Sequence, residues 1–151
     1  MIEDLAEITG LERDCATAAH WSDPQYHQLF ADVASSPHRL ILVAIKGSTV
    51  VVGFLVARHV ALEWELENIV VATEARGKGI GTHLLAQLLW RAQMSQSAAV
   101  FLEVRHSNTA ARRLYEKMGF SETGRRNRYY SSPVEDAVLY SKTLRKGDAS
   151  G

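Results

Sequence analysis

The chain has 151 residues, of which 46% are hydrophobic and 23% charged, and its seventeen basic side chains balance seventeen acidic ones. This length is typical of one domain with a sizeable core, so we expect a single domain over 1–151. Zero formal net charge gives no support for nucleic-acid binding, which needs a net basic surface. One cysteine, Cys15, excludes an internal disulfide and a cysteine-based zinc site. The six histidines show no metal-ligand spacing, and we predict no metal.

Targeting signals are not evident in the chain. Its apolar runs are far shorter than the roughly 20 residues needed to span a bilayer. The first residues, Met1-Ile2-Glu3-Asp4, are acidic where a secretory signal is basic. We therefore expect a cytoplasmic protein that does not bind membranes.

The first quarter of the chain predicts two helices. Apolar residues recur at helical spacing over 3–15. Ser22-Asp23-Pro24 is a cap followed by proline at the first helical position, and it begins a second helix that runs to Val33. Pro37 terminates this region.

The remainder alternates between strands and helices and predicts an α/β fold, a mixed twisted sheet flanked by helices. Strands are expected at Leu40–Ile45, Val50–Val60, Leu62–Ala72, Ala98–Val104, Phe120–Tyr130 and Val134–Leu144. Helices are expected at Thr82–Met94, which is amphipathic, and at Asn108–Met118, which Gly119 terminates as a left-handed residue. The polar tail 145–151 is expected to be frayed.

A glycine-rich loop, Arg76-Gly77-Lys78-Gly79-Ile80-Gly81, separates a predicted strand from a predicted helix. Closely spaced glycines let backbone N–H groups approach a phosphate, and the helix N-terminus attracts the same anion. A tight turn with a solvated basic pair is the alternative. A dinucleotide fingerprint fails because Thr82 stands at its third glycine, and a P-loop fails because Gly79 follows Lys78.

Two titratable residues follow the loop in positions suited to acid–base chemistry. Glu103 interrupts an apolar strand, where burial raises a carboxyl pKa toward the range of a general base. Tyr115 lies seven residues after Asn108, two helical turns on and therefore on the same face. A purely structural role is the alternative for both Glu103 and Tyr115, and Asn108 can cap its helix whether or not it touches a ligand.

The glycine loop resembles the coenzyme A signature of the GNAT superfamily of N-acetyltransferases, and Glu103, Asn108, Tyr115 and Gly119-Phe120 resemble its next conserved block. The resemblance implies the GNAT fold, with acetyl-CoA as the acetyl donor. It implies that the amides of the preceding strand bind the pantetheine arm and that the loop binds the pyrophosphate. The residues concerned are Ile69, Val70 and Val71 for the arm, and Arg76, Gly77, Lys78, Gly79, Ile80, Gly81 and Thr82 for the pyrophosphate, with Asn108 near the cofactor.

Further segments resemble the RimI-type enzymes within this superfamily, which acetylate the N-terminal alanine of a small-subunit ribosomal protein. The matching segments are His20-Trp21-Ser22, Glu65-Leu66-Glu67-Asn68-Ile69, Leu102-Glu103-Val104-Arg105, Ala110-Ala111, Arg126, Tyr129-Tyr130 and Glu135-Asp136-Ala137. This resemblance implies Glu103 as the general base, Tyr115 as the acid, and Tyr129 and Tyr130 as residues that hold the acceptor. The implied partner is a protein N-terminus, in particular that of a ribosomal protein, and the oligomeric state is left open between monomer and weak dimer.

Several features leave alternatives open. Glu65 and Glu67 share a strand face, which is either a negative groove for the acceptor or a solvated face. A backbone N–H near Val70 would meet the thioester oxygen if the strand is bulged there. Arg125, Arg126 and Arg128 are expected to form a solvated cluster, with contact to the coenzyme phosphate as the alternative.

The chain also departs from the pattern of these enzymes. It starts almost at the first helix, so the first strand of the family is expected to be missing, and Ser131 replaces the proline that usually follows the tyrosine pair. An acetyltransferase of small amines and a non-catalytic acyl-CoA sensor are the rival interpretations.

Overall fold

The computed structural model describes residues 38–47, 50–131 and 134–144. The two helices predicted in the first quarter, the expected absence of a first strand and the predicted frayed tail fall outside these ranges.

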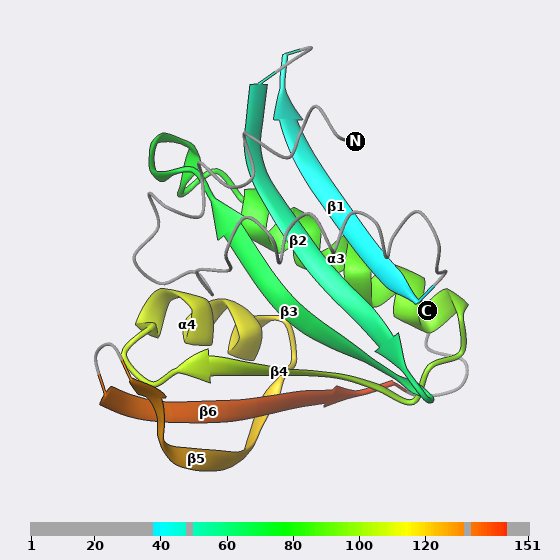
Figure 1. Ribbon diagram of the computed structural model, residues 1–151. Helices are drawn as coiled ribbons and strands as arrows, with labels where there is room; N and C mark the ends of the chain where they lie inside the picture. The colour runs from blue at the N-terminus through cyan, green and yellow to red at the C-terminus, as the bar shows by residue number, and fades with distance from the viewer. Residues whose placement is uncertain (1–37, 48–49, 132–133, 145–151) are drawn as a thin grey trace.

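The described residues form one mixed sheet of six strands in the order β1-β2-β3-β4-β6-β5 (Figure 1). Neighbouring strands are antiparallel except for β3 and β4, which are parallel. This confirms the predicted fold class, and each strand matches its predicted range to within one residue at either end. The strands are β1 (Arg39–Lys46), β2 (Val50–Val60), β3 (Glu63–Val71), β4 (Ala99–Arg105), β5 (Ser121–Ser131) and β6 (Val134–Thr143).

Two helices and a short 3-10 turn, η1 (Thr73–Ala75), connect these strands. Helix α3 (Ile80–Met94) buries its apolar side against the sheet, with Leu85 and Leu88 fully inaccessible to solvent. It begins two residues before its predicted start because Gly79, in the left-handed region at φ 81°, serves as its N-cap. Among the helices that the structure describes, none is long and apolar enough to cross a membrane.

Helix α4 (Thr109–Lys117) has well-defined ends, which fix the position of Tyr115 in its last turn. At its start the side chain of Asn108 accepts a hydrogen bond from Ala111 N at 3.2 Å. At its end the N–H of Gly119 donates to Glu116 O at 3.1 Å, and the N–H of Phe120 donates to Tyr115 O at 3.0 Å. This bonding pattern requires a left-handed residue, and Gly119 supplies it at φ 95°, as predicted.

The parallel pairing of β3 with β4 is short. It joins Glu63–Leu66 to Ala99–Leu102 and then ends, and the two strands diverge toward their carboxyl ends (Figure 1). A bulge at Glu67 accompanies the divergence, because Leu66 pairs with Ala57 whereas Asn68 pairs with the adjacent Val56. Bulges bend a strand and increase its twist, so the strand leaves its partner at this point.

This opening is the feature that positions the site. Ligands of open α/β sheets bind where parallel strands separate at their carboxyl ends. The bulge lies three residues before Val70, which pairs in regular register with Phe54. The bulge considered at Val70 from the sequence is therefore wrong, because the extra residue is inserted where the β4 pairing stops.

Candidate active site

Two cavities meet at the opening between β3 and β4. One, of about 430 Å³, is lined by the end of β3, the glycine loop and α4. The other, of about 380 Å³, is lined by β3, β4, Tyr115 and the tyrosine pair of β5. Both volumes are within the range of small-molecule sites. Ile69, Asn108 and Ala111 line both cavities, so a molecule bound in the first can present its end to the second.

The first cavity, hereafter the loop cavity, has the backbone geometry of an anion site. Gly77 and Gly79 both lie in the left-handed region, at φ 78° and 81°, and a β-carbon on either would meet no atom within 4 Å. Closely spaced left-handed turns direct successive N–H groups into a concave surface. The N-terminus of α3, capped by a residue without a side chain, adds its unpaired N–H groups and its positive dipole end.

The two basic residues of the loop are placed differently. Arg76 lines the loop cavity, and its Nε donates to Val71 O at 3.2 Å, which fastens the loop to the end of β3. Lys78 is exposed and is not among the residues that line the loop cavity. An anion in this cavity would therefore meet mainly backbone amides.

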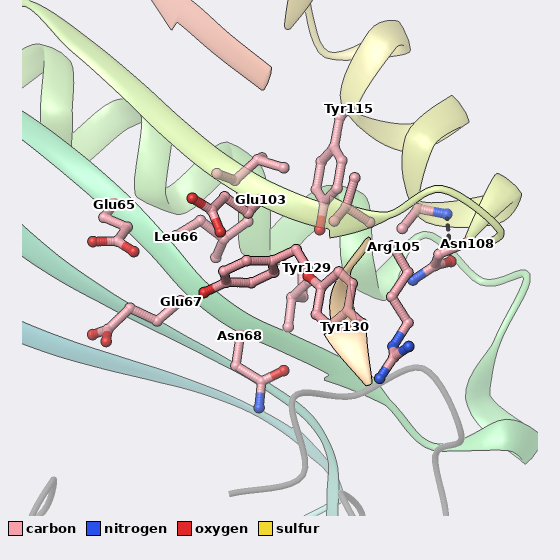
Figure 2. Close-up of a pocket in the computed structure, with 14 residues that line it drawn as sticks. Glu65, Leu66, Glu67, Asn68, Glu103, Arg105, Asn108, Tyr115, Tyr129 and Tyr130 are labelled. Atoms are coloured by element: carbon pink, nitrogen blue, oxygen red, sulfur yellow. Dashed lines mark hydrogen bonds between the residues drawn. The ribbon is translucent and has the colours of Figure 1, made fainter. Parts of the chain in front are cut away.

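The second cavity, hereafter the acceptor cavity, brings together all the side chains that the sequence suggested for catalysis and acceptor binding. Figure 2 shows them converging from β3, β4, α4 and β5. These side chains are those of Glu65, Glu67, Glu103, Tyr115, Tyr129 and Tyr130.

Tyr115 is the most buried of these side chains, at 4% exposure. Its ring packs against those of Phe120 and Tyr140, with centroids 5.9 and 6.1 Å away, and its hydroxyl end points into the acceptor cavity (Figure 2). Burial raises the pKa of the Tyr115 phenol far above its ordinary value, and the charge interaction with Tyr130 adds to this shift. The phenol therefore keeps its proton and is able to donate a hydrogen bond.

Glu103 is only partly buried, with 24% of its side chain exposed, and it forms an ion pair with Arg126 at 3.1 Å. The burial considered for this carboxyl from the sequence is therefore only partial. The three arginines Arg125, Arg126 and Arg128 are exposed, as the predicted solvated cluster requires, but two of them form ion pairs. Arg126 pairs with Glu103 and lies 5.2 Å above the ring of Tyr129, whereas Arg125 pairs with Glu122 at 2.9 Å.

The sequence left two alternatives for Glu65 and Glu67, a negative groove and a solvated face. The structure shows neither, because both carboxylates form ion pairs. Glu65 pairs with Arg58 at 2.9 Å, and Glu67 pairs with Arg39 at 3.1 Å. Partly buried charges are stable when they are paired. The β3 wall of the acceptor cavity is therefore polar but locally balanced in charge.

Two polar residues that the sequence did not suggest as site residues also line the acceptor cavity. Arg105 shares a strand face with Glu103 because it lies two positions later, a signal that was available in the sequence. Its guanidinium lies 4.2 Å from the centroid of the Tyr130 ring, within range of a cation–π contact. Asn68 is buried in the regular alternation of β3, in phase with Leu66 and Val70, and it lines the acceptor cavity next to Glu67.

Glu135 of β6 braces the loop between β4 and α4. Its carboxylate accepts from Ser107 N at 2.9 Å and from Ser107 Oγ at 3.1 Å, and it forms an ion pair with Arg105 at 3.3 Å. The bond from the Ser107 backbone is the main reason why the pKa of Glu135 is lowered, and the Ser107 hydroxyl and Arg105 add to the effect. One carboxylate therefore fixes both the cation over Tyr130 and the residue that precedes Asn108.

Residues 5–120 match the family model described as "Acetyltransferase (GNAT) family", and the chain belongs to this family. This confirms the family resemblance found in the sequence.

Several individual proteins within this family are similar to the chain in sequence or in structure. The chain is 36% identical over 132 residues to the N-alpha-acetyltransferase RimI of Mycobacterium tuberculosis, which covers 85% of this chain and 80% of that protein. It matches the crystal structure of the ribosomal-protein-S18-alanine N-acetyltransferase from Escherichia coli with a TM-score of 0.82 and 26% identity, covering 98% and 94% of the two chains. It also matches a chain of the NatC complex bound to Gag peptide and CoA with a TM-score of 0.77 and 26% identity, covering 95% and 92%.

The contacts of Glu135 with Ser107 and Arg105 predict how the stability of the protein depends on pH. Glu135→Gln should lower the free energy of unfolding at pH 7 by about 1–3 kcal/mol, because charge-assisted hydrogen bonds are lost. The folded-state pKa of Glu135 lies below its ordinary value, so its contribution to stability is present above about pH 4.3 and is lost as the pH falls through the folded-state value.

Urea unfolding of both proteins between pH 7 and pH 3 checks this. The difference between wild type and variant should stay constant down to about pH 4.3 and shrink below it. A difference that persists unchanged at pH 3 would contradict the bracing role of this carboxylate.

Proposed function

We propose that the protein is an acetyl-CoA-dependent N-alpha-acetyltransferase that modifies the N-terminus of a protein beginning with alanine or another small residue, in particular a ribosomal protein. The observation that carries this proposal is the junction of the two cavities at Ile69, Asn108 and Ala111. An anion-binding surface lies on one side of the junction, and a carboxylate, a neutral phenol and an aromatic wall lie on the other.

The donor fits the loop cavity. The pyrophosphate of acetyl-CoA would bind the amides between Gly77 and Thr82, at the positive end of the α3 dipole. The pantetheine arm would lie along Ile69, Val70 and Val71, where β3 faces the opening because its pairing with β4 has ended at Leu66. The thioester would then reach the shared residues, next to Asn108.

The reaction is direct transfer. The neutral amine of the acceptor attacks the thioester carbonyl, a new C–N bond forms, and the C–S bond breaks to release the thiolate. Glu103 takes the proton that the amine loses, through a water molecule. Tyr115, which burial keeps protonated, donates a hydrogen bond and then its proton to the departing sulfur, and the phenol regains a proton from solvent.

An N-terminal amine suits this site better than a lysine. The pKa of an α-amine is about 7.7–8.0 and that of lysine about 10.4, so near pH 7 only the α-amine has a sizeable neutral fraction and needs one weak base. Tyr129 and Tyr130, whose rings meet edge to face at 5.2 Å, provide an aromatic wall for the first residues of the acceptor. The activity named for the similar E. coli enzyme, on the alanine of ribosomal protein S18, supports an alanyl acceptor.

Two glycines provide a matched test of the donor site. Gly79→Val and Gly47→Val each place a branched residue at positive φ with open space around its β-carbon, so both should destabilise the protein by at least about 1–2 kcal/mol. Coenzyme A should raise the melting temperature of wild type and of Gly47→Val by mass action. It should fail to do so for Gly79→Val, where the side chain blocks the phosphate, and an equal shift in both variants would refute the loop assignment.

The acid and the base give a second test. Tyr115→Phe and Glu103→Gln should each lower kcat by roughly 10²–10⁴-fold and leave the coenzyme A thermal shift intact, because neither residue lines the loop cavity. Stopped assays of thiol release measure this. Full activity of Glu103→Gln at neutral pH would show that another base acts.

The acceptor is tested with one peptide that carries an N-terminal alanine and an internal lysine. Mass spectrometry after incubation with acetyl-CoA should find the acetyl group on the α-amine and little on the lysine. Acetylation mainly of the lysine, or of small free amines alone, would exclude N-terminal specificity. Coenzyme A binding without any acetylated product would favour a sensor.

A further inference from the structure

A cation already occupies the place beside the proposed base. The guanidinium of Arg126 contacts the Glu103 carboxylate at 3.1 Å and lies 5.2 Å from the centroid of the Tyr129 ring. Glu103 and Tyr129 both line the acceptor cavity, so Arg126 uses one negative and one aromatic partner of that cavity.

Only the side chain of Arg126 has to move for this contact to open. Its backbone pairs with Ala137 of β6 at the last regular position before the register breaks as far as Tyr130. Within that break Arg128 adopts φ 53°, and its N–H donates to Asp136 Oδ1 at 2.9 Å. The Arg126 side chain itself is 54% exposed, so the guanidinium can turn outward into water from a fixed backbone.

The acceptor arrives with the same kind of charge. With a pKa of about 7.7–8.0, most α-amines are ammonium ions at or below pH 7. An ammonium ion is attracted by a carboxylate and by an aromatic face, which are the groups that Arg126 contacts. The arginine and the incoming N-terminus therefore compete for one position.

We propose that Arg126 is a displaceable placeholder, a positioning residue that pairs with Glu103 in the empty site and is replaced there by the amine of the acceptor. In the empty site, Arg126 pairs with the partly buried carboxylate of Glu103, which would otherwise have no ion-pair partner there among the residues that the structure describes. It is exchanged at little cost, because an ion pair with an exposed partner contributes only weakly to stability. Once the guanidinium has turned outward, the Glu103 carboxylate is available to the amine, whose proton it takes through a water molecule. This inference rests on the proposed function of Glu103.

The test compares one peptide in two charge states. An alanyl peptide without lysine and its Nα-acetylated counterpart are titrated at pH 6.5 into the protein saturated with coenzyme A. Arg126→Gln should bind the free-amine peptide about two- to five-fold more tightly than wild type does, the range of an exposed ion pair. Its affinity for the acetylated peptide should be unchanged, because that peptide carries no competing charge.

Three variants serve as controls. Arg125→Gln removes the neighbouring arginine, which pairs with Glu122, and should alter neither affinity. Arg126→Lys keeps the cation and should keep the wild-type ratio of the two affinities. In a Glu103→Gln background, Arg126→Gln should produce no selective gain, because the competition takes place at that carboxylate.

The outcomes separate this inference from the proposed function. Weaker binding of both peptides by Arg126→Gln would make Arg126 a peptide-binding residue, and equal changes or none would also refute the placeholder. Either result, with a wild type that acetylates the peptide, overturns this inference alone. A wild type that forms no acetylated peptide overturns the proposed function, and this inference with it.

Discussion

The early end of the β3–β4 pairing is the constraint on which the site depends. Parallel strands that stay paired would close the sheet, but here the ladder stops at Leu66 and Leu102 and the bulge at Glu67 turns β3 away. The edge of β3 beyond Leu66 then faces an opening instead of a strand. The opening connects the glycine loop at the N-terminus of α3 with a polar cavity, and Tyr115 of α4 contributes to the lining of that cavity. This connection is what the proposed direct transfer from donor to acceptor requires.

The negative charges that line the acceptor cavity are balanced by ion pairs with arginines. Each of its three carboxylates has an arginine from a different strand, and these arginines differ in exposure. Arg39, the partner of Glu67, is 21% exposed, whereas Arg126, the partner of Glu103, is 54% exposed. Buried pairs hold the wall in one arrangement, and exposed pairs open readily. The pair at the proposed base is thus the one best able to change, while Glu135 keeps Arg105 and the loop before Asn108 in place.

Local sequence patterns predicted most of the described fold but not its irregularities. Strand and helix ranges followed from hydrophobic periodicity, and the end of α4 followed from Gly119, because both depend on residues close in the sequence. The bulge at Glu67 and the pairing of Glu103 with Arg126 depend on register and on a contact between residues 23 positions apart, which no local pattern encodes. The sequence therefore suggested the residues that converge on the acceptor cavity, but it misjudged the environment of the base and missed the brace formed by Glu135.

A single compound can test whether the two cavities form one continuous path. Coenzyme A joined through an acetyl bridge to the α-amine of an alanyl peptide should occupy both cavities at once. Because the second half then binds at a high effective concentration, its affinity should exceed that of coenzyme A alone by about 10²–10⁴-fold. The same compound joined through a lysine side chain should gain much less. If the α-amine conjugate binds no more tightly than coenzyme A, the cavities do not form one path, and direct transfer between them is excluded.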